Sequence, residues 1–176
     1  EQMKTILESF RGYIQEADFS KYTQGGSITL YHYMSKPRFG QEVEETVIID
    51  PKYFSDPKTR NYYTNKEYQV SSVPRTFWYV DPKQRERQVA QGSTLYRATI
   101  SADKIYDLRE DPDGYKKAAA HPIYGLRKGE EWNTLLENLR EDYEGVFYGG
   151  SFDVVSLFKP YSASRVPEEE QASLEA

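Results

Sequence analysis

Three groups of side chains, far apart in the sequence, have the chemistry that a site for a planar, polar ligand needs. The first is His32 with a tyrosine on either side, the second is the aromatic pair Trp78-Tyr79, and the third is the acid Asp153 in a late apolar run. Aromatic rings stack on planar ligands, and a carboxylate stabilises positive charge that develops during a reaction. The order of the three groups predicts a site built from separate strands.

Each group also has a purely structural interpretation. A lone histidine on an apolar strand is commonly a satisfied core residue. Most of the 16 tyrosines suit a small core that is reinforced by hydroxyl hydrogen bonds. Asp153 lies near a predicted hairpin turn, where a carboxylate can simply be solvated. The functional hypothesis therefore depends on the three groups occurring together and in this order.

Other common chemistries have no support in the sequence. The chain has no cysteine, which removes disulfides, thiolate metal sites and cysteine nucleophiles, and its two histidines, His32 and His121, are too far apart for a zinc motif. No phosphate-binding glycine loop and no nucleophile elbow is present. The sequence Asp111-Pro112-Asp113-Gly114 is typical of a turn, and no metal site is expected there or elsewhere. No motif in the sequence supports a nuclease or a nuclease inhibitor.

The three groups resemble motifs of the ADP-ribosyltransferases of the diphtheria-toxin and poly(ADP-ribose) polymerase type. Leu30-Tyr31-His32-Tyr33-Met34-Ser35 resembles their first motif, and Phe77-Trp78-Tyr79-Val80-Asp81, followed by a helix, resembles their second. The segments 143–146 and 152–160 are similar to the ending of members encoded by phages and mobile elements. The resemblance spans about residues 27–161.

The resemblance implies NAD as the cofactor and assigns roles to individual residues. His32 would hydrogen-bond the nicotinamide ribose, and Trp78 or Tyr79, depending on the alignment, would stack on nicotinamide. Asp153 stands where the family carries a glutamate, although matching backwards from Pro160 places Val154 or a neighbour there instead. The residues implied in NAD binding are Tyr31, His32, Tyr33, Arg38, Arg75, Trp78 and Tyr79, with the two arginines near the pyrophosphate.

The implied reaction is cleavage of the nicotinamide N-glycosidic bond and transfer of ADP-ribose to a macromolecule, expected to be a protein, or to water. In this reaction Asp153 would stabilise the ribosyl cation. Such a protein would act as a toxin, an effector or a phage protein. The alternative is a noncatalytic interaction module, a degenerate transferase fold that binds a protein partner. The missing glutamate favours this alternative.

The sequence predicts an α+β fold with a mixed, mainly antiparallel split β-sheet and flanking helices. Residues 2–16 and 130–143 repeat apolar side chains at helical spacing, and Asp81-Pro82 is typical of a helix start. Strands are predicted where β-branched and aromatic residues are frequent, or where the type of side chain alternates from one residue to the next. These predicted strands are 27–34, 47–49, 75–80, 94–100, 104–108, 145–148 and 152–158.

The length of 176 residues predicts one domain, residues 1–161, with a helical N-terminal segment 1–24 and a polar tail or linker 162–176. A net charge of −5 disfavours nucleic acid as a partner, since affinity for phosphate requires clustered lysine and arginine. No apolar run is long enough for a membrane span. Together with the absence of cysteine, these features predict a cytoplasmic protein, or one that acts in the cytoplasm of a host.

Overall fold

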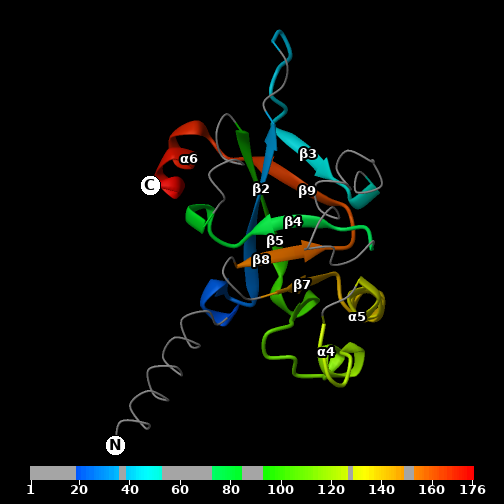
Figure 1. The fold of residues 1–176 in the computed structure, drawn as a ribbon. Helices are drawn as coiled ribbons and strands as arrows, with labels where there is room; N and C mark the ends of the chain where they lie inside the picture. Colours follow the sequence, from blue (N-terminus) through cyan, green and yellow to red (C-terminus); the bar gives the residue numbers. More distant parts are fainter. Residues whose placement is uncertain (1–18, 36–38, 53–72, 85–92, 127–128, 149–152) are drawn as a thin grey trace, which may run out of the picture.

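The computed structural model describes residues 19–35, 39–52, 73–84, 93–126, 129–148 and 153–176. Within these residues the strands form one nine-stranded sheet, and helices cover parts of it (Figure 1). The strands are β1 (Thr23–Gln24), β2 (Ser27–Ser35), β3 (Thr46–Ile49), β4 (Thr76–Tyr79), β5 (Ser93–Ser101), β6 (Ile105–Asp107), β7 (Gly145–Phe147), β8 (Val154–Leu157) and β9 (Tyr161–Arg165). The helices are η1 (Phe19–Tyr22), η3 (Pro82–Gln84), η4 (Ala102–Lys104), α4 (Tyr115–Ala119), α5 (Gly129–Asp142) and α6 (Glu168–Glu175).

The strand order is β3-β9-β5-β2-β4-β8-β7-β6, and β1 pairs with the start of β2. Among the described pairs β6–β7 is parallel and the others are antiparallel. The predicted α+β class with a mixed, mainly antiparallel sheet is therefore confirmed, whereas the predicted split is not seen among the described strands, which form one sheet. The strand that carries His32, β2, is central, because it pairs with β5 along its whole length and with β4 on its other side.

The sheet must be strongly curved, because the connection between β8 and β9 is too short for a flat sheet. Three strands lie between β8 and β9, so a flat sheet would separate them by about 19 Å. The chain from Leu157 to Tyr161 spans at most about 14 Å. The sheet therefore curls until these two strand ends approach each other.

The carboxylate of Glu144, just before β7, holds the connection between β8 and β9. It accepts a hydrogen bond from the Tyr161 hydroxyl, and the ammonium nitrogen of Lys159 lies 3.3 Å from its Oε1. Lys104 adds an ion pair of 3.7 Å, and the Phe158 backbone N–H donates to the Glu144 carbonyl at 2.9 Å. Glu144 thus fixes the connection between β8 and β9 to the β6–β7 end of the sheet.

The two faces of the curved sheet bury different clusters. The face that carries Leu30, Trp78 and Val155, called here the inner face, holds the larger core cluster together with Phe19 from η1. The opposite or outer face carries Tyr33 and Leu95 at one end and Val146 at the other. Strand alternation produces this division, since successive side chains point to opposite faces.

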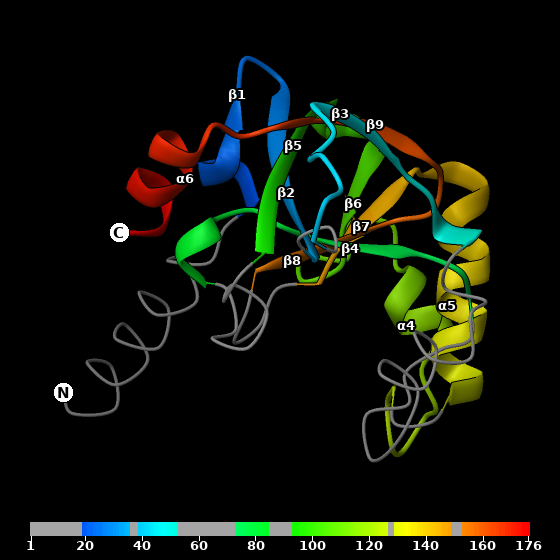
Figure 2. The ribbon, with the colours of Figure 1, turned by 90° about the horizontal axis from the view of Figure 1, so that it is seen from above.

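Helices cover the outer face at two separate places. The helix α5 buries Leu135, Leu136 and Leu139 completely against the β6–β7 end, as its apolar spacing predicted. The helix α6 lies at the other end, beside β5, and the two views show α6 and the α4–α5 pair on opposite sides of the molecule (Figures 1 and 2).

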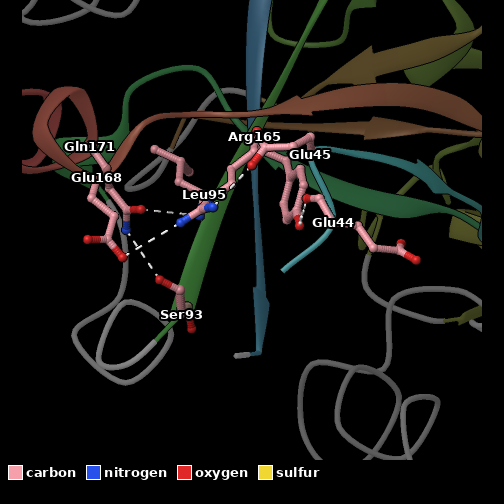
Figure 3. A network of polar contacts seen from close by, with 8 residues as sticks. Glu44, Glu45, Ser93, Leu95, Arg165, Glu168 and Gln171 are labelled. Atoms are coloured by element: carbon pink, nitrogen blue, oxygen red, sulfur yellow. Dashed lines mark hydrogen bonds and ion pairs between the residues drawn. The ribbon is translucent and has the colours of Figure 1, made fainter. Parts of the chain in front are cut away.

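The C-terminal residues are ordered, and the predicted polar tail from 162 is wrong in this respect. Residues 161–165 form β9, which lies between β3 and β5, and α6 follows. β9 pairs with β5 only at Tyr96 and Arg97, so the backbone of β5 needs another partner beyond them. The Gln171 amide supplies it: Oε1 accepts from the Leu95 N–H and Nε2 donates to the Ser93 carbonyl, both at 3.3 Å (Figure 3). These contacts explain why a polar segment can complete the sheet.

The predicted strands at 27–34, 47–49, 75–80, 94–100, 104–108, 145–148 and 152–158 are confirmed as β2 to β8, with ends that differ by at most two residues. After Asp81, whose Oδ1 accepts from the Lys83 N–H at 3.0 Å, η3 begins at Pro82 as predicted. The short helix α4 was not predicted. The helix predicted at 2–16, the rest of the helix after 84 and the hairpin turn at 149–150 lie outside the described residues.

Candidate functional site

His32 lies on the inner face, in the middle of β2, with its ring half-buried. Its Nδ1 is 2.7 Å from the Phe77 carbonyl oxygen, and its ring centroid is 5.2 Å from that of Trp78 on β4. Burial lowers the pKa of His32 below its ordinary value, and the contact with the Phe77 carbonyl opposes this effect only in part. A carbonyl can only accept, so Nδ1 carries the proton of the neutral ring and Nε2 is a hydrogen-bond acceptor.

Trp78 packs beside the His32 ring on the inner face. Its side chain is fully buried, and its indole N–H donates to the Thr76 hydroxyl at 2.8 Å. The register places Trp78 opposite Val155 of β8, on the inner face. Because none of its ring is exposed, Trp78 fixes the position of the imidazole in this conformation and has no surface left for a stacked ligand.

Asp153 lies at the start of β8 and is also on the inner face. Its backbone carbonyl accepts from the Val80 N–H at 3.4 Å, which continues the β4–β8 ladder by one residue beyond Val154. Its side chain is only 4% exposed, and Oδ2 accepts a hydrogen bond from the Tyr22 hydroxyl of η1. A carboxylate is seldom buried to this extent without hydrogen bonding, and Tyr22 provides a donor.

The register relates Asp153 to His32. Only β4 lies between their strands, and Asp153 is level with Val80 and Leu30, whereas His32 is level with Trp78. Two strand spacings and a shift of two residues put the Cα atoms about 12 Å apart. Two of the predicted site residues thus come together on one face from positions about 120 residues apart in the chain.

The tyrosines predicted for the same site lie on the outer face. Tyr31 pairs with Tyr79 across β2 and β4, and Tyr33 packs edge-on against Tyr79 with ring centroids 5.9 Å apart. The Tyr33 hydroxyl donates to Glu175 of α6 at 2.9 Å. Burial raises the pKa of Tyr31, which lies near Arg97. These three tyrosines form a cluster under α6, on the side of the sheet that His32 does not face.

Of the two arginines predicted near a pyrophosphate, the structure describes only Arg75. Arg75 is buried, and its Nη1 donates to the Val73 carbonyl at 2.8 Å. Its guanidinium carbon lies 5.0 Å from the centroid of the Phe77 ring, which is on the outer face with Tyr79. Arg75 is therefore not brought to the face of His32. Arg38 lies outside the described residues.

Tyr22 is the residue at this site that the sequence did not predict. It stands in a short polar stretch before Gly25-Gly26, where no pattern indicates a functional side chain. Within the described residues, no group of three metal-ligating side chains could hold an ion. The helices in the described ranges are also too short or too polar to span a bilayer. The site is thus an imidazole and a carboxylate on one face, with Tyr22 on the carboxylate.

Comparisons of the chain with models of protein families, with curated proteins and with solved structures found no match. The geometry of the site is therefore the basis for an assignment of function.

Proposed function

We propose that this domain binds NAD on the inner face of its sheet, cleaves the nicotinamide glycosidic bond and transfers ADP-ribose to a protein acceptor in the cytoplasm. One observation carries the proposal: the register puts His32 and Asp153 on the same face, with only β4 between them. Their Cα atoms are about 12 Å apart, a distance that two side chains and a ribose between them can span.

His32 suits the binding of a sugar hydroxyl. Its Nδ1 donates to the Phe77 carbonyl and its ring packs on Trp78, so both its position and its tautomer are fixed. Its lowered pKa keeps the ring neutral near pH 7. The acceptor Nε2 can then receive a hydrogen bond from a hydroxyl of the nicotinamide ribose and orient the sugar.

Asp153 suits the stabilisation of the ribosyl cation. When the bond between C1′ of the ribose and the nicotinamide nitrogen breaks, its electron pair leaves with nicotinamide and positive charge develops on the ribose. A carboxylate in a buried setting stabilises that charge more than one in water would. An acceptor nucleophile then bonds to C1′ and loses its proton. In this proposal Trp78 supports His32 and is not the ring that contacts nicotinamide.

The test is transfer of a tagged ADP-ribose from NAD to protein by the full chain. His32→Ala and Asp153→Asn should each lower transfer and NAD cleavage by at least a hundredfold while the domain remains folded in thermal unfolding. His121→Ala, at the exposed second histidine, is the matched control and should retain activity. Full activity in the His32 and Asp153 variants would refute the proposal.

A second candidate is a noncatalytic module that binds a protein partner through this fold. The burial of both Asp153 and Trp78 favours it, because a site that is closed in the free protein has no open contact with NAD. Thermal unfolding with and without NAD separates the candidates. NAD at 100 times its dissociation constant stabilises a binding domain by about 2.7 kcal/mol, whereas a module without an NAD site shows no shift.

A further inference from the structure

We infer that the Tyr22 hydroxyl keeps this site closed by occupying Asp153, and that NAD binds after the Tyr22 side chain has turned away. The inference rests on the proposed function and adds a control element to the same site. It starts from the contact itself: the Tyr22 hydroxyl donates a hydrogen bond to Oδ2 of Asp153, whose side chain is 4% exposed.

The Tyr22 hydroxyl can compete with a hydroxyl of the substrate for the Asp153 carboxylate. An ionised carboxylate can only accept hydrogen bonds, and a phenol hydroxyl and a ribose hydroxyl are the same kind of donor. Tyr22 therefore occupies an acceptor oxygen of the carboxylate that faces the ribose in the proposed function. Substrate and Tyr22 cannot both donate to that oxygen along the same direction, so one replaces the other.

The backbone around Tyr22 is anchored, which limits the movement to its side chain. Phe19, at the start of η1, packs into the inner core with its ring centroid 5.0 Å from that of Phe147. Thr23 follows Tyr22 directly and pairs with Ile28 of β2, the strand that carries His32. The Thr23 hydroxyl also donates to the Ser20 carbonyl at 2.8 Å. The segment is held on both sides of Tyr22.

Tyr22 lies nearer the surface than Phe19. Its ring is half-buried at the edge of the inner core, and its centroid lies 6.4 Å from that of Phe147. The ammonium of Lys21, an exposed residue, lies 4.9 Å from the centroid of the ring. A change of side-chain rotamer moves the hydroxyl off Asp153 without breaking the pairing of β1 with β2. Such rotamer changes are fast in partly exposed side chains.

The closed state lowers the apparent affinity for NAD by the fraction of molecules that are open. Tyr22→Phe keeps the ring and removes the hydroxyl, so the closed state loses the bond that favours it. A hydrogen bond to a charged group corresponds to roughly a tenfold to hundredfold change in an equilibrium constant. The Kd and KM for NAD should therefore fall at least tenfold in Tyr22→Phe, with kcat unchanged.

The experiment measures NAD binding by calorimetry and NAD cleavage with the full chain, for the natural protein and for two variants. Tyr115→Phe is the matched control, because the Tyr115 hydroxyl donates to Asp142 on the α4–α5 side of the molecule. Its Kd and KM should equal those of the natural protein. Thermal unfolding confirms that both variants are folded.

The outcomes separate this inference from the proposed function. A tighter Kd in Tyr22→Phe, with unchanged kcat, supports the closed site. An equal Kd in both proteins overturns it and leaves the proposed function standing, as does a lower kcat, which would make Tyr22 an aid to Asp153. If neither the natural protein nor Tyr22→Phe binds or cleaves NAD, the proposed function fails and this inference fails with it.

Discussion

Replacing Glu144 by glutamine is expected to destabilise the fold by about 1–2 kcal/mol at pH 7. The carboxylate is 24% exposed, accepts from the Tyr161 hydroxyl and lies within ion-pair distance of Lys159 and Lys104. A hydrogen bond to a charged group contributes about 1.5–3 kcal/mol, and glutamine retains part of it as a neutral acceptor for Tyr161. In a chain of this size the loss corresponds to a fall in Tm of about 2–8 °C.

The pH dependence of this effect has a defined sign. The Tyr161 hydroxyl, followed by the two lysines, lowers the pKa of Glu144 in the folded protein. Because its pKa is lower in the folded state, the ionised Glu144 stabilises the fold fully at pH values above its pKa in the unfolded chain, about 4.3. This stabilisation is lost as the pH falls through the pKa of Glu144 in the folded protein. The difference in unfolding free energy between the natural protein and Glu144→Gln should therefore shrink below about pH 4.

The assay is urea unfolding at a series of pH values, with Glu137→Gln as the matched control. Glu137 forms an exposed ion pair with Arg140 on α5, and such pairs contribute little, so its loss should cost less than about 0.5 kcal/mol. If both variants lose the same stability at pH 7, or if the cost of Glu144→Gln does not change on acidification, Glu144 does not hold the β8–β9 connection as described.

Three further changes test the packing. Gly145→Ala should cost about 1–3 kcal/mol in urea unfolding, because its Cβ would lie 2.7 Å from both Leu157 Cδ2 and the Ser156 carbonyl oxygen, and a backbone atom cannot easily move. Gln171→Ala should cost about 1–2 kcal/mol and accelerate hydrogen exchange of the Leu95 amide, which loses its acceptor; unchanged exchange would contradict the contact. Asp111→Ala should cost at least about 1 kcal/mol and reduce helicity by circular dichroism, because its carboxylate accepts from the first backbone N–H groups of α4; unchanged helicity would refute this.

The fold was predictable where side-chain patterns are strong. The run Ser27–Met34 has the β-branched and aromatic residues of a buried strand, and the leucines of α5 repeat at helical spacing. The segment Tyr161–Arg165 offered no such signal, since only Ala163 among its residues is buried and serines flank it. Its place in the sheet depends on partners such as Gln171, which sequence patterns do not reveal.

The candidate site was predictable only in part, for a related reason. His32 and Asp153 were chosen from local motifs, but their common face follows from the register of β2, β4 and β8, which depends on long-range pairing. The alternation of side chains along a strand separates Tyr31 and Tyr33 from His32. Tyr22 contacts Asp153 across 131 positions of the chain, a relation that no local pattern encodes.

The central position of β2 governs when the site can form during folding. Thr29 of β2 meets Thr99 at a separation of 70 positions, and Glu45 meets Arg165 at 120. Contacts of such length slow folding, because long loops must close before the contacts can form. On the ribosome β2 emerges well before β8, so His32 stays without its opposing acid until β8 has been synthesised. Any activity carried by the two residues would arise only after β8 has paired with β4.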